Sequence, residues 1–391
     1  MRIVFFTDSF KPDLSGLVVA IDILRRELIE LGHEVMLVAP AQGKYRDPEN
    51  NVIRIFSLRC PGRLKKYYLA SPVGSGLFKQ LSAWQPDVIH LHTPFTVGYL
   101  GLKYARKHGV PAVTTFHTHF EEYVHYIPLP SSLMRSFARW STKDFFNKCQ
   151  AAVAPGSAAL KILQDYGVSI PITVIPSGID WPAFQNVEPE ESRKALGIQP
   201  QNVVLVYLGR VAKEKNIPFL FDVTAQLLKE EELKAKIKFL VVGGGPELAS
   251  IKELAGAKNV GGQTIFTGMI PKEKVPFYLA AGDIFIYSSV TETQGLVVTE
   301  AMASGLPVVA VKAMGVEDAL KDGEGGFLCR LDVREFAEKL RPLILDENLR
   351  SRMGQKAKMS SREFSSRRMA EKMADLYKSL AGRKDGVPHV D

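Results

Sequence analysis

The chain has 391 residues, too many for one ordinary hydrophobic core, and its length therefore predicts two domains. Hydrophobic residues make up 46% of the chain and charged residues 24%, which is ordinary for a soluble globular protein. The net charge of +8 favours an anionic partner and does not choose among nucleic acid, anionic lipid and a phosphorylated substrate.

The cysteines and the apolar segments argue against several classes of protein. Cys60, Cys149 and Cys329 are odd in number and far apart, so they fit neither a disulfide framework nor a zinc site, and a reducing compartment is expected. The opening sequence MRIVFFTDSFK has too short an apolar run for a signal peptide. No apolar run approaches the roughly 18 residues of a membrane span, and we expect a cytoplasmic protein.

Short β-rich runs alternate with helical patterns in the first half of the chain. RIVFFTD (residues 2–8) predicts a first strand, and a helix is expected over Val18–Leu31 because its apolar residues recur on one stripe. Further strands are predicted at EVMLVAP (34–40), VIRIFSL (52–58), PDVIHLH (86–92), PAVTTFH (111–117), AAVAPGS (151–157) and ITVIPSGID (172–180).

The second half restarts the same alternation. Strands are predicted at NVVLVYLGR (202–210), IKFLVVGGG (237–245), QTIFTGM (263–269), DIFIYSS (283–289) and PVVAV (307–311), and residues 347–380 are helical and charged. Continuous Val/Ile/Leu runs are typical of parallel strands buried on both faces. Two such series in tandem predict an α/β fold with two Rossmann-like, doubly wound domains.

The expected domain boundary is the polar stretch 180–194. We assign residues 1–182 to an N-terminal domain, residues 195–360 to a C-terminal domain, and residues 381–391 to a flexible tail. After the first strand the dinucleotide pattern Gly-x-Gly-x-x-Gly is absent and only Gly16 precedes the helix, which disfavours a nicotinamide dehydrogenase. GGGPE at 243–247 fits a tight strand-to-helix turn and a ligand contact equally well.

The segment SSVTETQGLVVTEAMASGLP (288–307) carries the most chemistry. Glu292 lies in a loop after a predicted strand, and a helix that begins near Gly295 carries Glu300 in its first turns. A helix N-terminus binds anions, and two flanking carboxylates suit the hydroxyls of a sugar on either side of a phosphate. This predicts a nucleotide-sugar pocket; the alternative is a capped helix with two solvated acids.

The segment LGRVAKEKN (208–216) places Arg210 and Lys215 at the carboxyl end of the second domain's first strand, where ligands bind in such sheets. Together these cations could neutralise a diphosphate without a metal. The alternative is two solvated cations in a loop that also holds Glu214. No Asp-x-Asp pair follows a strand and no His/Cys cluster has metal-ligand spacing, so no metal or cofactor is expected.

Taken together, Gly16, the Gly-Arg-x4-Lys of 209–215, GGGPE and Glu292-x7-Glu300 resemble the retaining glycosyltransferases of family 4. The resemblance covers nearly the whole chain in the same order. It implies the GT-B fold, with two Rossmann-like domains facing across a cleft and C-terminal helix 363–380 crossing back to the N-terminal domain. It also implies metal-independent transfer of a sugar from a nucleotide donor.

The resemblance implies a role for each matched residue. Glu300 is expected to bind the ribose hydroxyls and Glu292 the hexose hydroxyls, while Arg210 and Lys215 hold the diphosphate and Gly16 closes over it. The implied donor-binding set also includes Gly243, Gly268, Gln294, Gly295 and Leu296. TTFHTHF (114–120) matches the family's strand-end histidine, which we place at His117 beside the reacting sugar carbon, with His119 as second choice. The implied catalytic set is His117, Glu292, Arg210 and Lys215.

Two segments, HTHFEEYVHYIP (117–128) and SVTETQGLVVTEA (289–301), resemble bacterial glucosyltransferases that act on diacylglycerol. They imply UDP-glucose as donor and 1,2-diacylglycerol as acceptor. The alternatives are another acceptor, such as phosphatidylinositol, a soluble sugar or a polysaccharide, and a non-catalytic nucleotide-sugar-binding protein. The intact set of matched residues argues against a non-catalytic protein.

A membrane acceptor also agrees with the charge pattern of residues 130–149. Arg135, Arg139 and Lys143 fall on one helix face, and Met134, Phe137, Trp140 and Phe145 lie mainly on others, as in an interfacial helix. RLKKYY (63–68) adds Arg63, Lys65 and Lys66. We therefore expect a peripheral protein on the anionic inner face of the membrane; the alternative is an ordinary amphipathic helix with a solvated basic face. No nucleic-acid-binding module is visible.

Overall fold

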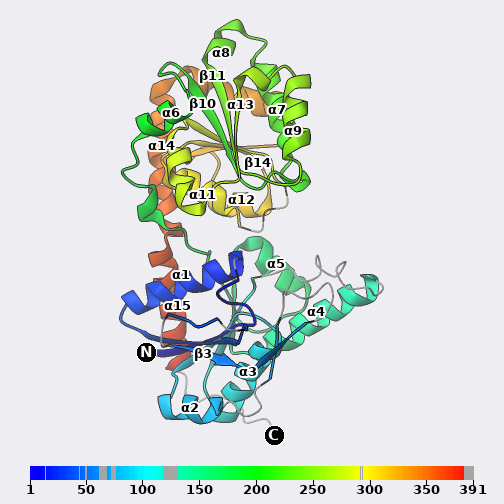
Figure 1. Cartoon of the computed structure of the whole chain (residues 1–391), viewed down its shortest axis with the longest axis vertical. Helices are drawn as coiled ribbons and strands as arrows, with labels where there is room; N and C mark the ends of the chain where they lie inside the picture. The colour runs from blue at the N-terminus through cyan, green and yellow to red at the C-terminus, as the bar shows by residue number, and fades with distance from the viewer. Residues whose placement is uncertain are drawn as a thin grey trace. The chain divides into compact units, whose positions relative to one another are not determined.

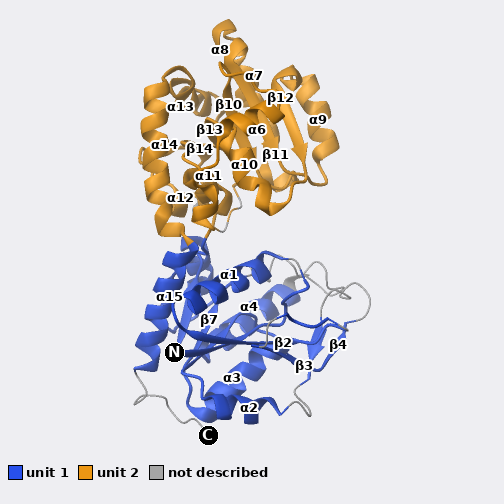
Figure 2. Cartoon of the chain, turned by 60° about the vertical axis from the view of Figure 1, so that its left-hand side comes forward, with its two compact units in different colours: residues 1–178, 366–391 blue, residues 179–365 orange. Residues whose placement is uncertain are grey.

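The protein forms two compact units, coloured separately in Figure 2. Unit 1 comprises Met1–Gly178 and Ser366–Asp391, and unit 2 comprises Ile179–Ser365. The structure is a computed structural model that describes residues 1–382 except for residues 14, 44, 49–50, 61–67, 72–75, 118–130, 291 and 293. No helix in the described ranges combines the length and apolarity that a membrane span requires.

A seven-stranded parallel sheet forms the centre of unit 1, in the order β3-β2-β1-β6-β7-β8-β9. Helices cover both faces, so Val4 and Phe6 of β1 enter one hydrophobic core while Ile3 and Phe5 enter the other. The strands are β1 (Arg2–Phe6), β2 (Glu34–Pro40), β3 (Val52–Ile55), β6 (Val88–Leu91), β7 (Ala112–Thr115), β8 (Ala151–Ala154) and β9 (Ile172–Val174).

The last helix of the chain belongs to unit 1. Helix α15 lies beside α1 (red and dark blue in Figure 1), and its Met373 and Tyr377 are buried in the same core as Ile21 and Leu24 of α1. Helix α1 begins at Gly16, earlier than expected, because the Ser15 hydroxyl accepts a hydrogen bond from the N–H of Val18. The helices are α1 (Gly16–Glu30), α2 (Leu77–Trp84), α3 (Thr96–His108), α4 (Ser131–Asn147), α5 (Ser157–Asp165) and α15 (Ser366–Ala381).

The single strand predicted over residues 52–58 is wrong. The strand is interrupted at Phe56. As a result β3 pairs with β2, while β4 (Ser57–Arg59) forms a separate antiparallel pair with β5 (Tyr68–Ala70). Phe56 and Leu58 are largely exposed. The apolar run was therefore not a sign of one buried strand, and β5 gave too short a signal to be predicted.

Unit 2 contains a six-stranded parallel sheet in the order β12-β11-β10-β13-β14-β15. Its strands are β10 (Val203–Leu208), β11 (Ile237–Val242), β12 (Thr264–Gly268), β13 (Ile284–Tyr287), β14 (Val308–Val311) and β15 (Gly326–Cys329). Its helices are α6 (Pro189–Ala195), α7 (Ile217–Leu227), α8 (Glu231–Lys236), α9 (Leu248–Ala257), α10 (Val275–Ala280), α11 (Leu296–Ala303), α12 (Met314–Ala319), α13 (Val333–Leu345) and α14 (Glu347–Ser361). Edge strand β15 was not predicted, because it is short and begins with glycine.

Both sheets have the strand order of a doubly wound α/β domain, and the predicted fold class is confirmed. In each sheet the strand order reverses next to the first strand, between β1 and β6 in unit 1 and between β10 and β13 in unit 2. Ligands of such sheets bind outside the carboxyl ends of the strands at this switch point.

The stretch 180–194, where we expected the domain boundary, is folded as part of unit 2. It forms a short 3-10 helix (Trp181–Phe184) and most of α6, and the division between the units falls at Gly178 and Ile179. Phe184 and Ser192 are buried, so the polar composition reflects only the outer faces of two short elements. The predicted helical region 347–380 is interrupted at Arg362–Phe364, and residues 383–391 of the expected tail lie outside the described part.

Candidate active site

Most of the predicted donor residues of unit 2 gather after β10 and β13, which are neighbours in the sheet, whereas Gly243 follows β11 and Gly268 ends β12. Two buried serines that follow β13 fix the loop after β10. The Ser288 hydroxyl lies 2.9 Å from the carbonyl oxygens of both Lys215 and Asn216, and the Ser289 hydroxyl donates to the carbonyl of Glu214 at 3.3 Å. The sequence analysis did not identify these serines, although they end a predicted strand.

Glu292 forms an ion pair with Lys215, and the same carboxylate oxygen accepts a hydrogen bond from the Tyr287 hydroxyl at 2.5 Å. Burial raises the pKa of Glu292, but the charge and hydrogen bond of Lys215, with the hydroxyls of Tyr287 and Ser289, outweigh burial and hold the pKa below its usual value. Glu292 is therefore ionised at neutral pH. The structure brings Lys215 and Glu292 together as a pair, whereas we expected Lys215 to hold the diphosphate and Glu292 the hexose hydroxyls.

Arg210 is an exposed cation at this edge. Its backbone is held by Tyr207, whose hydroxyl donates to the Arg210 carbonyl oxygen at 3.0 Å. The Tyr207 ring stacks on Tyr287 with centroids 5.9 Å apart, and burial raises the pKa of both phenols. Within the described residues the Arg210 guanidinium makes no hydrogen bond or ion pair, so this cation is available to a ligand. The sequence analysis did not predict a role for either tyrosine. A polar hydroxyl near the end of an otherwise apolar strand was the signal that could have identified them.

Helix α11 presents its N-terminus at the same edge. Gly295 precedes the helix with φ of 65°, and a Cβ there would lie 2.9 Å from the carbonyl oxygen of Gly315. The N–H groups of Leu296 and Val297 have no carbonyl partner among the described residues, as is usual for the first turn of a helix. The N-terminus therefore keeps two donors and the positive end of the helix dipole for an anion. Gln294 is buried next to it.

Glu300 is half-buried in α11, and burial raises its pKa to about 7, against a smaller lowering effect of Lys272. Its carboxyl group has no hydrogen-bond donor in the described ranges. The two predicted glutamates thus differ in charge state at neutral pH, since Glu292 is paired with a cation and Glu300 is not. A ligand that donates hydroxyl hydrogen bonds would stabilise the ionised form of Glu300.

The glycines of GGGPE are explained by close packing. Gly243 has φ of 132°, and a Cβ there would lie 2.0 Å from the carbonyl oxygen of Gly209. A Cβ at Gly245 would lie 2.2 Å from the carbonyl oxygen of Val211. Gly243 also forms a bridge with Gly268 at the end of β12. Of the two open readings, a tight strand-to-helix turn accounts for this motif without a ligand.

The remaining predicted site residues lie in unit 1. Gly16 opens α1 and is exposed. His117 follows β7, is half-buried, and its Nε2 lies 3.0 Å from Nδ1 of His92, which follows β6. Burial lowers the pKa of His117 to about 4, so its imidazole is neutral at neutral pH. His119 lies outside the described residues.

Comparisons with known proteins decide the family. The model of the family described as Glycosyltransferase Family 4 matches residues 14–181, and that of Glycosyl transferases group 1 matches residues 188–360. A protein of Streptococcus pneumoniae named alpha-monoglucosyldiacylglycerol synthase is 35% identical over 318 residues, which cover 79% of this chain and 71% of that protein. This chain belongs to glycosyltransferase family 4.

A second alpha-monoglucosyldiacylglycerol synthase, from Acholeplasma laidlawii, is 28% identical to this family 4 glycosyltransferase over 98% of both chains. Among solved structures, Anabaena Alr3699/HepE in complex with UDP-glucose is 19% identical and has a TM-score of 0.71, with 97% of this chain and 100% of that chain covered. A sucrose-phosphate synthase from Thermosynechococcus elongatus is 18% identical, with a TM-score of 0.72 and coverage of 97% and 99%. These neighbours confirm the predicted GT-B fold.

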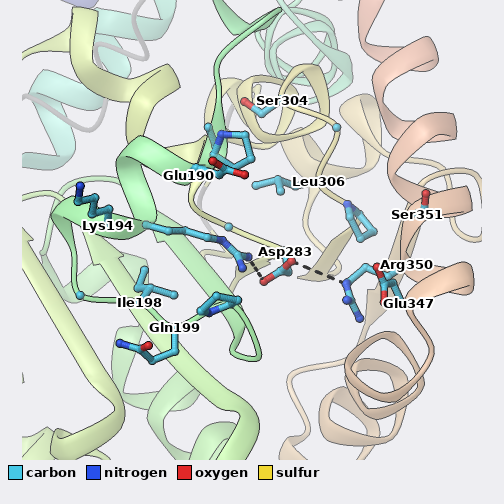
Figure 3. A pocket seen from close by; sticks show the side chains of 18 residues that line it. Glu190, Lys194, Ile198, Gln199, Asp283, Ser304, Leu306, Glu347, Arg350 and Ser351 are labelled. Atoms are coloured by element: carbon cyan, nitrogen blue, oxygen red, sulfur yellow. Dashed lines mark hydrogen bonds and ion pairs between the residues drawn. The ribbon is translucent and has the colours of Figure 1, made fainter.

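A separate pocket of about 800 Å³ lies at the amino edge of the unit 2 sheet (Figure 3). Asp283, just before β13, accepts a hydrogen bond from Arg193 of α6 at 2.5 Å, and Arg350 of α14 lies 3.9 Å away. The Asp283 carboxylate also accepts from the N–H of Val204 at 2.7 Å. Amino and carboxyl ends of parallel strands lie at opposite edges of a sheet, so this pocket is not the predicted donor site of the glycosyltransferase.

Helix α4 of this glycosyltransferase has an exposed apolar stripe. Leu133, Phe137 and Trp140, spaced four and three residues apart, are 64%, 55% and 59% exposed. Phe145 and Phe146 near the end of the helix are buried in the unit 1 core, so only the first turns are unpacked. Arg135, Arg139 and Lys143 are exposed, and Arg139 lies over the Tyr166 ring at 5.7 Å. Arg63, Lys65 and Lys66 lie outside the described residues.

Proposed function

We propose that this family 4 glycosyltransferase moves glucose from UDP-glucose to the free hydroxyl of 1,2-diacylglycerol, with retention of the anomeric configuration and without a metal. The observation that carries the proposal is the similarity to two proteins named alpha-monoglucosyldiacylglycerol synthase, one of them 35% identical. A GDP-mannose-dependent alpha-mannosyltransferase of Corynebacterium glutamicum is 27% identical, so relatives at lower identity use another donor. The donor is therefore the first property to test.

The geometry of unit 2 suggests how such a donor would bind. Glu300 would accept hydrogen bonds from the two ribose hydroxyls, which explains a half-buried carboxyl group that receives no hydrogen bond from the residues that the structure describes. The Arg210 guanidinium and the first N–H groups of α11 would hold the diphosphate. Glu292, kept ionised and oriented by Lys215 and Tyr287, would accept hydrogen bonds from hexose hydroxyls.

Catalysis would consist largely of positioning and of stabilising the departing diphosphate. Arg210 and the α11 N-terminus supply positive charge that is already in place, so little reorganisation is needed as the glycosidic bond breaks. Attack of the acceptor hydroxyl on the same face, assisted by the leaving group, would retain the anomeric configuration. In this scheme a neutral His117 would be a hydrogen-bonding group beside the reacting sugar and not a cation.

The acceptor would be reached by docking of unit 1 on the inner face of the membrane. The exposed apolar stripe Leu133, Phe137 and Trp140 would insert at the interface, while the cations of α4 and of residues 63–66 would contact anionic headgroups. Each cation near such a surface contributes about 1 kcal/mol.

A donor panel tests the reaction. The purified chain is incubated with labelled UDP-glucose, UDP-galactose or GDP-mannose and with vesicles that contain diacylglycerol, and the lipids are extracted. We expect label in the lipid phase from UDP-glucose alone, in an α-linked product identified by NMR. Transfer from GDP-mannose, transfer only to a water-soluble acceptor, or a β-linked product would overturn the proposal.

Vesicle flotation tests the docking surface. Changing Arg135, Arg139 and Lys143 to Glu should weaken binding to anionic vesicles by a factor of about 100 or more, because about 3 kcal/mol of attraction is lost. The matched control changes exposed Arg334, Arg352 and Lys356 of unit 2 to Glu, which alters the net charge equally. Trp140→Ser should weaken binding in a way that salt affects less. Equal binding of both triple variants would contradict docking through α4.

A further inference from the structure

Three histidines lie in a line at the carboxyl ends of β6 and β7 in unit 1. His90, the innermost, is fully buried and has both ring nitrogens satisfied: Nδ1 lies 2.6 Å from the Tyr377 hydroxyl and Nε2 lies 2.7 Å from the Thr115 hydroxyl. His92 comes next, and its ring centroid is 4.0 Å from that of His90. His117 forms the outer, half-buried end of the line.

The middle histidine has one hydrogen bond and no room to turn. His92 is 2% exposed, and its ring packs against His90 and, in an edge-to-face contact with centroids 4.7 Å apart, against Phe5. Its Nδ1 lies 3.0 Å from Nε2 of His117. Its Nε2 is buried and has no hydrogen-bond partner among the described residues. Packing therefore fixes the ring, and one nitrogen is left unsatisfied.

The unsatisfied nitrogen decides which way the hydrogen bond runs. A neutral imidazole carries one N–H and one bare nitrogen. If Nε2 of His117 donated to Nδ1 of His92, the proton of His92 would sit on its buried Nε2 as an N–H without an acceptor, which is rare in proteins. If Nδ1 of His92 donates, the buried Nε2 is only a bare lone pair, and the proton of His117 must lie on its outer nitrogen, Nδ1.

We propose that His92 is a positioning residue that holds His117 in the tautomer with its proton on Nδ1, so that His117 offers an N–H donor to an oxygen of the sugar donor. Burial lowers the pKa of all three histidines, and the neighbouring histidine rings lower the pKa of His90 and His92 further. All three imidazoles are therefore neutral at neutral pH. The ligand chemistry rests on the proposed function, which places His117 beside the reacting sugar. The tautomer itself does not depend on that placement.

The tautomer limits what His117 can do. An outward Nδ1–H can donate to a hydroxyl or phosphate oxygen but cannot accept a proton from the attacking acceptor hydroxyl. His117 then holds the donor substrate in place and is not a general base. Deprotonation of the acceptor is left to the departing phosphate oxygen, in agreement with leaving-group assistance.

Nitrogen NMR of the full chain labelled with ¹⁵N-histidine measures the tautomer in the wild type, with the His117 resonances assigned by their loss in His117→Asn. We expect a protonated Nδ1 and a bare Nε2 at neutral pH. His92→Leu should shift His117 toward the tautomer with its proton on Nε2, because the Nδ1–H of His92, which requires an unprotonated Nε2 on His117, is gone. Tyr377→Phe, which removes the partner of His90 only, should leave the tautomer unchanged. A protonated Nε2 in wild-type His117 would overturn the proposal, whatever the variants do.

Turnover supplies the second test. The side-chain amide of Asn reaches the position of Nδ1 and that of Gln the position of Nε2, so His117→Asn should keep more activity than His117→Gln. His92→Leu should lower kcat about ten- to a hundredfold, as loss of an orienting hydrogen bond does, with little change in KM for diacylglycerol. His92→Asn, which restores a donor, should recover most of the loss. Equal loss in Asn and Gln variants of His117 would contradict the donor role.

The two proposals fail in different ways. Unchanged turnover in His117→Ala would show that His117 is not beside the reacting sugar, which contradicts that part of the proposed function, while the NMR result still decides the tautomer. Conversely, full activity in His92→Leu together with a large loss in His117→Ala would refute the positioning role of His92 and keep His117 in the site.

Discussion

Each of the two edges of the unit 2 sheet carries a carboxylate that is held by polar partners. The edges differ in whether other charged or polar groups remain without a partner among the described residues. At the amino edge, Asp283 is shared by Arg193, Arg350 and the N–H of Val204, and each arginine is also bonded to backbone carbonyls. At the carboxyl edge, Lys215 and Tyr287 satisfy Glu292, while Arg210 and the carboxyl group of Glu300 have no partner in the described part of the chain.

The difference separates a structural clamp from the proposed binding site. Asp283 connects α6 and α14 to β10 and β13, so its interactions stabilise the fold and its own charge is paired with two arginines. The carboxyl edge keeps an exposed cation, a helix N-terminus and a carboxyl group with a raised pKa, and such unsatisfied groups gain their partners only when a ligand binds. The pocket of about 800 Å³ at the amino edge is therefore not by itself a reason to place the active site there.

The sharpest test exchanges one arginine at each edge. Arg210→Ala should lower kcat by about two to three orders of magnitude, the usual loss when one preorganised electrostatic contact is removed, with an unchanged melting temperature. Arg350→Ala should lower the melting temperature and leave kcat unchanged, since it serves the clamp. Steady-state kinetics and thermal unfolding of both purified variants measure this. Near-wild-type turnover in Arg210→Ala would contradict the site assignment.

Asp283→Asn tests the clamp directly. The change leaves two arginines around a neutral amide and should lower the free energy of unfolding by about 2 kcal/mol, between the values for exposed and buried ion pairs. Turnover at a temperature below the transition should not change. Urea unfolding measures the effect, and Glu338→Gln on the exposed side of α13 is the control. A loss of turnover without a loss of stability would mean that the amino edge takes part in the reaction.

Glu300 should make nucleotide affinity depend on pH. Its pKa is raised to about 7, and ribose hydroxyls donate to the ionised form, so binding must expel a proton wherever the carboxyl group is protonated. UDP affinity should therefore rise a few-fold as the pH increases through about 7, measured by calorimetry. In Glu300→Gln the contribution of Glu300 to the pH dependence of UDP affinity should vanish, and only the contribution from ionisation of the UDP phosphate should remain. An identical pH profile in both proteins would remove Glu300 from the ribose contact.

The smallest expected effect is that of a chelator. Arg210, Lys215 and the α11 N-terminus supply the positive charge that a divalent cation supplies elsewhere, so turnover should persist in excess EDTA. Initial rates with and without EDTA, and with added magnesium or manganese, measure this. A complete loss that either metal restores would show that the carboxyl edge is not sufficient by itself.

The sequence alone predicted the fold class, which the structure confirms, and a set of donor-site residues, most of which the structure brings to the carboxyl edge of the unit 2 sheet. Continuous apolar runs such as those of β10 and β11 are buried on both faces, and only a parallel sheet explains them. The order of Glu292, Gly295 and Glu300 correctly predicted a loop after a strand, followed by a helix that begins after Gly295, because local sequence largely determines such a turn. The family resemblance gave these residues roles that local chemistry alone left open.

Local sequence patterns gave wrong predictions in segments where the burial of the residues did not follow from their composition. Residues 180–194 have a polar sequence, yet the stretch is folded into unit 2, because one face of a short helix is enough to anchor it. Residues 52–58 have an apolar sequence, yet the strand breaks at Phe56, which is exposed. In both cases the deciding contacts come from segments far away in the chain.

Tertiary structure alone decided the charge states of the site. Glu292 and Glu300 are eight positions apart and chemically identical, but a lysine and a tyrosine reach one of them and no donor among the described residues reaches the other. His92 and His117 follow different strands, and their rings form a hydrogen bond only because β6 and β7 are neighbours. A pKa or a tautomer depends on distance and burial in three dimensions, and neither can be read from the order of residues along the chain.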